Sequence, residues 1–248
     1  MDKESLRQLD EIQLSRCLPF LRKYYQNLRG QFKDFQELVK ENLKPELRVL
    51  DAGCGDGQWG DISQLISSHS FVVGIDEDEE SLKKNTTIKQ LFKGDLHQLP
   101  FGSSEFDLVI CRSVFEHLAD PKKVIAEFKR VLSDQGRVIV YTQNRCNPVM
   151  FLSSIMPVWL RKILKIIIMR KDCDEGTYKA FYKCNTKSNF RRLFRKEGFK
   201  EVKFVRHGQC PGYWKNSLFL NCFLIFEKLT DWKRLNFFKA HIVAVYEK

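Results

Sequence analysis

The residues best able to do chemistry are an acid followed by a cluster of glycines. Asp51 stands directly before Gly53, Gly55 and Gly57, and a second acid, Asp76, ends the next apolar run. Glycines let the backbone turn sharply and approach a ligand closely, and a helix that follows offers free N–H groups. The pattern therefore predicts a ligand site at a turn from a strand into a helix.

The two acids indicate which ligand this turn accepts. A dinucleotide-binding fingerprint requires glycine at the position of Gln58. A carboxylate at Asp51 repels a pyrophosphate but suits a ligand that carries an ammonium group. Asp76 has the position of a carboxylate that accepts hydrogen bonds from ribose hydroxyls. Since acids at strand ends are often only helix caps, the inference rests on both acids together.

Alternating strands and helices must position this site. We expect residues 1–44 to be helical and helices to follow near residues 58–68, after Asp76, from Asp120-Pro121 to Gly136, and from Thr186 to Gly198. This order predicts an α/β fold with a doubly wound, mostly parallel, Rossmann-like sheet of seven strands in one domain of residues 1–248. The strands are expected at residues 48–51, 71–75, 91–92, 106–111, 137–141, 199–205 and 241–246.

A family resemblance supports this interpretation. Residues 49–57 resemble motif I of the class I S-adenosylmethionine-dependent methyltransferases. Segment 115–121 is similar to the subgroup that includes ubiquinone- and menaquinone-pathway methyltransferases. The resemblance covers residues 45–145, so it implies the cofactor S-adenosylmethionine, with S-adenosylhomocysteine as product, and is nearly silent on the methyl acceptor. Further segments agree in order and spacing at residues 73–76, 94–101, 106–109 and 127–137.

At the methionine end of the cofactor, the resemblance assigns roles to the first and fourth strands. Asp51 would anchor the region near the methionine ammonium. Gly53, Cys54 and Gly55 would let the chain pass the methionine part. Cys111 and Arg112 would line this end after the fourth strand.

At the adenosine end, the resemblance assigns roles to the second and third strands. Asp76 would accept from the ribose hydroxyls. Asp95 would face the adenine amino group, and Leu96 would supply a backbone contact. Glu77 departs from the family, which often has an apolar residue packed on adenine here, although the aliphatic stem of Glu77 can still cover the ring.

Catalysis itself requires little more than a held acceptor, exclusion of water and, for some acceptors, removal of one proton. His117 is the candidate general base, because it follows the fourth strand at the mouth of the predicted crevice. The alternative is a capping histidine near Asp120, and His207 is a weaker candidate. Cys54 and Cys111 are interpreted as small packing residues rather than nucleophiles.

Charge is unevenly distributed along the chain. Residues 1–144 hold 20 Lys and Arg against 23 Asp and Glu, whereas residues 145–248 hold 22 against 8, which together give the net charge of +11. The basic second part indicates an anionic substrate, a membrane surface or nucleic acid, and the alternative is a solvated basic surface without a partner.

Two insertions, residues 146–184 and 209–236, are expected to cap the cofactor end of the sheet and select the acceptor. Segment 149–170 is interpreted as a helix packed on the domain. The alternatives are a lid over an apolar substrate and an interfacial helix in peripheral contact with a membrane, whose Arg161, Lys162, Lys165 and Arg170 would meet anionic headgroups.

The leading hypothesis is an enzyme that methylates a small-molecule or lipid-like acceptor by in-line displacement. An RNA methyltransferase that uses the basic second part, and a non-catalytic binding protein with this fold, are the alternatives; no RNA-binding module supports the former. No signal peptide is indicated and segment 149–169 is a poor membrane span, so a cytoplasmic protein is expected. The spacing of the eight cysteines favours reduced thiols over a metal site or disulfides.

Overall fold

The computed structural model describes residues 3–30, 32–57, 65–66, 68, 71–157, 159–161, 163–164, 179–208 and 214–248. The chain divides into two compact units. The sheet unit comprises residues 33–144, 180–205 and 242–248, and the helical unit comprises residues 1–32, 145–179 and 206–241. The two expected cap insertions, residues 146–184 and 209–236, therefore fall largely in the same unit as the first 32 residues. The expectation of a single domain stays a prediction.

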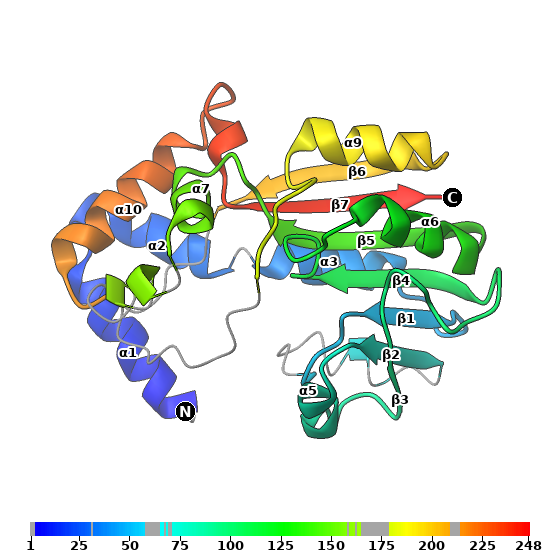
Figure 1. Ribbon diagram of the computed structural model, residues 1–248. Helices are drawn as coiled ribbons and strands as arrows, with labels where there is room; N and C mark the ends of the chain where they lie inside the picture. Colours follow the sequence, from blue (N-terminus) through cyan, green and yellow to red (C-terminus); the bar gives the residue numbers. More distant parts are fainter. Residues whose placement is uncertain are drawn as a thin grey trace. The chain divides into compact units, whose positions relative to one another are not determined.

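A seven-stranded sheet organises the chain, in the order β3-β2-β1-β4-β5-β7-β6 (Figure 1). Parallel pairing joins β1 to β2 and β4, β2 to β3, and β4 to β5, and β7 points against its neighbours. The predicted doubly wound, mostly parallel sheet is confirmed. Its strands are β1 Val49–Ala52, β2 Val72–Asp76, β3 Gln90–Lys93, β4 Phe106–Arg112, β5 Leu132–Gln143, β6 Lys200–His207 and β7 His241–Glu247.

Parallel order brings the carboxyl ends of β1, β2, β4 and β5 to one edge of the sheet. The register pairs Asp51 of β1 with Gly74 of β2 and with Ile110 of β4. β1 is buried along its whole length, as expected for a central strand covered on both faces. The turn after β1 and the loop after β4 are thereby held at the same edge.

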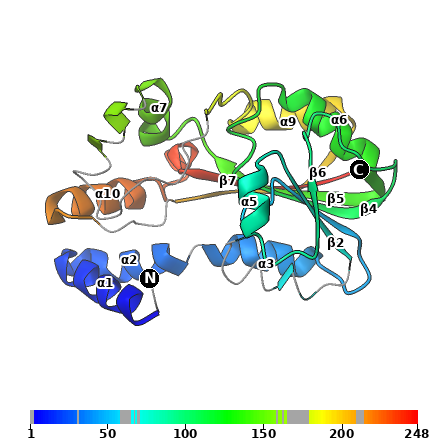
Figure 2. The ribbon, with the colours of Figure 1, turned by 60° about the horizontal axis from the view of Figure 1, so that its bottom comes forward.

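Helices cover both faces of the sheet in the sheet unit. α6 (Pro121–Val131) and α9 (Lys187–Lys196) lie on one face, and α3 (Phe32–Asn42) lies on the other (Figure 2). The predicted caps of α6 and α9 are confirmed, since the side chains of Asp120 and Thr186 accept hydrogen bonds from the main-chain nitrogens of Lys123 and Asn189. The short helix α5 (Glu79–Lys84) follows β2.

The prediction that Gly136 ends α6 is wrong. The helix ends at Val131, and Gly136 lies inside β5, which follows the helix without a loop. β5 is irregular at its start, because Leu132 pairs with Phe106 and the next paired residue is Arg137. A side chain at position 136 would place its Cβ 2.8 Å from the Ser133 carbonyl oxygen, so the irregularity, and not a helix end, requires the glycine.

The helical unit contains α1 (Lys3–Arg16), α2 (Pro19–Gly30), α7 (Pro148–Ile155), α10 (Ser217–Leu229) and the short 3-10 helix η1 (Asn236–Phe238). Leu21 and Leu28 of α2 pack with Leu220 and Leu224 of α10 in one core cluster. The helix α10 lies in a segment for which only an aromatic-rich excursion was expected. Residues 159–161 and 163–164 are also helical, and no helix of the described residues is long and apolar enough to cross a membrane.

Most of the helix expected near residues 58–68 lies outside the described residues. The same holds for Lys162, Lys165 and Arg170 of the expected interfacial segment. The described regular parts of segment 149–170 are therefore α7 and the helical residues 159–161 and 163–164, and the expected membrane contact stays a prediction.

Candidate functional site

The glycine turn after β1 is built for close approach. Gly53 has a φ of +79°, and a Cβ at this position would overlap the side chain of Val114. The main-chain nitrogens of Gly53 and Cys54 both donate to the Ile75 carbonyl, at 2.8 and 3.1 Å. The turn is thus pinned to the end of β2, and only glycine fits where it passes the loop that follows β4.

Asp51, at the end of β1, is a buried acid in need of a donor. Its residue surface is 3% exposed, and its Oδ1 finds no hydrogen-bond partner among the described residues. Burial raises the pKa of Asp51 to about 7; the Arg112 guanidinium opposes this rise, and Asp76 adds to it. An ammonium group placed here satisfies both the free oxygen and the negative charge.

Asp76, at the end of β2, closes the other side of the turn. Its Oδ2 accepts from the Gly55 nitrogen at 2.8 Å, and its Oδ1 accepts from the Asp78 nitrogen at 2.9 Å. Each carboxylate oxygen can accept a second hydrogen bond, so this residue holds the turn and still has capacity for two hydroxyl groups. Its expected role toward ribose stays a prediction.

The expected adenine end lies after β2 and β3. Glu77 is exposed and Leu96 is buried in the sheet core. Asp95 is exposed, and its Oδ1 accepts from the His97 main-chain nitrogen at 2.9 Å and lies 2.6 Å from the His97 Nδ1. Burial acts to raise the pKa of Asp95, but the hydrogen bonds and charge of His97 outweigh it and hold this pKa below its usual value.

Cys54 and Cys111 are both fully buried. Burial raises the pKa of each thiol, and the Asp51 carboxylate raises it further. Both thiols are therefore protonated at neutral pH, which supports the interpretation as packing residues rather than nucleophiles. Their expected proximity to the methionine part of the cofactor stays a prediction.

Glu116 is a site residue that the sequence reasoning missed. It is 1% exposed and its Oε2 accepts from the Thr142 hydroxyl of β5 at 2.6 Å. Its Oε1 is buried and has no hydrogen-bond partner in the described part of the chain. Burial raises the pKa of Glu116, whereas the charges of His117 and Arg112 act to lower it.

Arg112 lies near both Glu116 and Asp51. Its guanidinium acts to lower the pKa of both Asp51 and Glu116, so one cation lies near two buried carboxyl groups that each retain an unpartnered oxygen among the described residues. The signal for Glu116 was present in segment 115–121, but a single acid after a strand has no distinctive spacing.

His117 follows Glu116 in the same turn after β4. Its main-chain nitrogen donates to the Val114 carbonyl at 2.8 Å, and its side chain is partly buried. The fold thus places it beyond the carboxyl end of β4, at the edge that holds Asp51 and Asp76. His207 ends β6 as expected but belongs to the helical unit.

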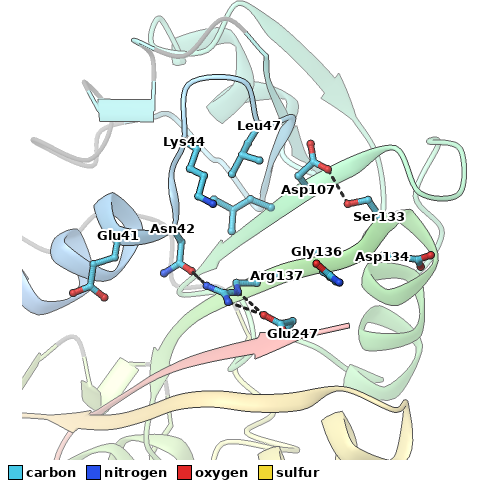
Figure 3. Close-up of a pocket in the computed structure, with 12 residues that line it drawn as sticks. Glu41, Asn42, Lys44, Leu47, Asp107, Ser133, Asp134, Gly136, Arg137 and Glu247 are labelled. Atoms are coloured by element: carbon cyan, nitrogen blue, oxygen red, sulfur yellow. Dashed lines mark hydrogen bonds and ion pairs between the residues drawn. The ribbon is translucent and has the colours of Figure 1, made fainter.

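A different pocket, of about 300 Å³, lies at the opposite edge of the sheet (Figure 3). It contains none of the predicted site residues. Arg137 reaches Glu247 with two hydrogen bonds of 2.8 and 2.7 Å and Asn42 with one of 2.9 Å. Arg137, Glu247 and Asn42 therefore hydrogen-bond to one another. The features that indicate a ligand site lie at the carboxyl edge, where strands β1, β2 and β4 end.

The fold and this edge define the class of protein. A pinned glycine turn, a buried acid free to accept an ammonium and a second acid with spare acceptor capacity fit S-adenosylmethionine. Residues 50–140 match the family described as methyltransferase domain. Together with the fold, this match supports a class I S-adenosylmethionine-dependent methyltransferase with S-adenosylmethionine as its cofactor.

Similar proteins agree with this class. The demethylmenaquinone methyltransferase of Staphylococcus saprophyticus is 26% identical over 207 residues, which cover 72% of this chain and 87% of that protein. The demethylmenaquinone methyltransferase of Lactococcus lactis is 28% identical over 65% of this chain and 69% of its own length.

Solved structures support the fold. A methyltransferase from Thermotoga maritima, described as a possible histamine N-methyltransferase, has a TM-score of 0.58 at 18% identity, with 92% of this chain and 93% of that chain covered. A methyltransferase from Mesorhizobium loti has a TM-score of 0.56 at 16% identity, over 86% of this chain and 96% of its own. At such identities the likeness shows the fold alone.

Proposed function

We propose that this enzyme methylates a small, apolar, quinone-like acceptor. The observation that carries the proposal is the extent of similarity to the demethylmenaquinone methyltransferase of Staphylococcus saprophyticus. That similarity spans 207 residues, whereas the methyltransferase domain match spans residues 50–140. Likeness confined to cofactor motifs says nothing of the acceptor, but this likeness extends well beyond them.

The helix that follows β5 supports an apolar acceptor. α7 begins at Pro148, five residues after the end of β5 along the chain, and is capped by the side chain of Asn147. Phe151, Leu152 and Ile155 of α7 are exposed, Ile155 to 65%. Exposed apolar side chains in a cluster are typical of a surface that receives an apolar ligand or partner.

The chain's own residues then divide the work. When bound, S-adenosylmethionine supplies a methyl group already activated by its sulfonium. Asp51 would hold its ammonium group, Asp76 would accept from the ribose hydroxyls, and Asp95, Leu96 and Glu77 would contact the adenine. The positive charge of Arg112 acts to lower the pKa of both buried carboxyl groups, Asp51 and Glu116, and so favours their ionised forms.

His117 serves as general base for an acceptor that must lose a proton. It lies on the turn after β4, next to Glu116, whose pKa it acts to lower. A neutral imidazole at this position can take a proton from a hydroxyl or an activated carbon as the methyl group arrives. The neighbouring carboxylate stabilises the imidazolium that results.

The test supplies methyl-labelled S-adenosylmethionine with a reduced, demethylated naphthoquinone of short side chain. We expect a labelled product heavier by one methylene group, formed with the wild type and with a Lys89→Glu control. Replacement His117→Gln is expected to lower kcat about a hundredfold with unchanged cofactor affinity. Label in an added RNA fraction, with none in the quinone, would overturn the proposal in favour of an RNA substrate.

A further inference from the structure

The helix α10 is apolar on two opposite faces. Leu220, Phe223 and Leu224 form the buried face and pack in the core cluster that includes α2. An exposed stripe runs along the other face at positions i, i+4, i+7 and i+11 of the helical repeat. The stripe consists of Leu218, Cys222, Ile225 and Leu229, with Leu218 exposed to 67%.

Two exposed aromatic residues lie next to α10. Trp232 follows α10 and is 67% exposed, and Phe20 at the start of α2 is 62% exposed. The Lys228 ammonium lies 5.5 Å from the centre of the Phe20 ring, which places Phe20 beside α10. We refer to the stripe together with Phe20 and Trp232 as the α10 face.

The charge around the α10 face is positive. Lys215, Lys228, Lys233 and Arg234 are all exposed. The acids nearby are engaged within the unit: Glu227 is buried, and Asp231 accepts from the Lys239 ammonium at 2.5 Å. Basic side chains therefore outnumber acidic ones by four to two in residues 214–235, and they lie on or next to α10.

We propose that the α10 face docks on an anionic lipid surface. Apolar side chains on one face of a helix enter the boundary between headgroups and acyl chains, and basic side chains at the border bind anionic headgroups. Trp232 supplies the amphipathic ring that favours this boundary. The charge complementarity selects anionic lipid over a neutral apolar partner.

This inference does not depend on the identity of the methyl acceptor. A lipid surface is where an apolar acceptor dissolves, so docking there would supply the enzyme with such a substrate. Vesicle binding itself requires no acceptor and no transfer. Failure of the docking surface and failure of the proposed quinone methylation are therefore separate results.

The experiment is flotation of the full chain with vesicles of phosphatidylcholine alone or mixed with phosphatidylglycerol. We expect binding to the mixed vesicles that weakens as salt rises, because salt screens the headgroup charge. The paired change Leu218→Ser with Ile225→Ser should lower vesicle binding by at least about tenfold, and Lys228→Glu with Lys233→Glu should do the same.

A matched control exchanges exposed apolar residues of the sheet unit. Phe71→Ser with Val202→Ser removes the same kind of surface elsewhere and should leave vesicle binding unchanged. Thermal unfolding and cofactor affinity of every variant establish that the chain is folded. If the variant with Leu218→Ser and Ile225→Ser unfolds, the variant with Lys228→Glu and Lys233→Glu still tests the proposal.

Three results would overturn the proposal. One is equal binding to both vesicle types at all salt concentrations. Another is equal loss in the control and the α10 variants. The third is an absence of vesicle binding together with a wild-type dimer that the serine variant converts to a monomer, which would make a second copy of this chain the occupant.

Discussion

The two edges of the sheet in the sheet unit use their charged residues in opposite ways. At the amino edge, Asp107 accepts from the Ser133 hydroxyl and the Arg48 nitrogen, and Glu247 accepts twice from Arg137. At the carboxyl edge, Asp51 and Glu116 are more deeply buried, yet each keeps an oxygen without a partner in the described residues. Since a buried unpaired polar atom destabilises a fold, the difference marks the carboxyl edge as the one adapted to a ligand.

The pH dependence of stability gives the largest effect that separates the two edges. Burial raises the pKa of Asp51 from its usual 3.8 to about 7 in the folded chain. A raised carboxyl pKa contributes stability below the unfolded value, and this contribution is lost as pH rises through the folded value. We expect the cofactor-free wild type to lose up to about 4 kcal/mol of unfolding free energy between pH 4 and pH 7 relative to Asp51→Asn.

Denaturant unfolding of both proteins across this pH range measures the effect. The Asp107→Asn variant serves as the control at the amino edge. If Asp51→Asn and the wild type show parallel stability curves, Asp51 does not carry the buried charge described above.

Replacement Gly53→Ala should have the next largest effect. The added Cβ overlaps Val114 and the residue keeps a positive φ, so we expect a loss of about 3 kcal/mol in unfolding free energy. The double variant Gly53→Ala with Val114→Ala should regain the part caused by overlap but not the part caused by backbone strain. A double variant no more stable than the single one would show that Val114 does not limit this turn.

Asp76→Ala tests the acid that holds the turn and is expected to accept from the ribose hydroxyls. It removes two hydrogen bonds to main-chain nitrogens, and we expect cofactor affinity to fall about thirtyfold, or 2 kcal/mol. Asp76→Asn keeps one acceptor oxygen, so its cofactor affinity should lie between those of the wild type and Asp76→Ala. Equal affinities of all three proteins, measured by calorimetry, would remove Asp76 from the cofactor site.

Arg137→Ala should have the smallest effect and no functional consequence. Its hydrogen bonds with Glu247 and Asn42 are partly exposed, so we expect a loss of about 1 kcal/mol in stability. Cofactor affinity should not change. A fall in affinity comparable to that of Asp76→Ala would show that the amino edge also shapes the ligand site.

The sequence allowed most of the sheet unit to be predicted, because its signals are local. The caps at Asp120 and Thr186, the apolar strands and the glycine turn each depend on neighbouring residues, and each is confirmed. Gly136 was misjudged because a glycine after a helix usually ends it, whereas here a strand starts at once and its irregular pairing takes the glycine.

The partnership of Glu116 with Thr142 could not be predicted, since it joins residues of two different strand ends. Only the register of β4 and β5 brings them together. The division into two units could not be predicted from local sequence signals either, because the helical unit combines three segments that are far apart along the chain. Such groupings depend on long-range packing that no short pattern encodes.

Calorimetric titration of S-adenosylmethionine into the wild type and Asp51→Asn is the most direct test of the account. We expect the wild type to bind and Asp51→Asn, which keeps the shape but loses the charge, to bind at least about a hundredfold more weakly. Arg137→Ala at the opposite edge should match the wild type. Equal affinity of the wild type and Asp51→Asn would contradict the claim that the unpartnered carboxyl group at the carboxyl edge holds the cofactor.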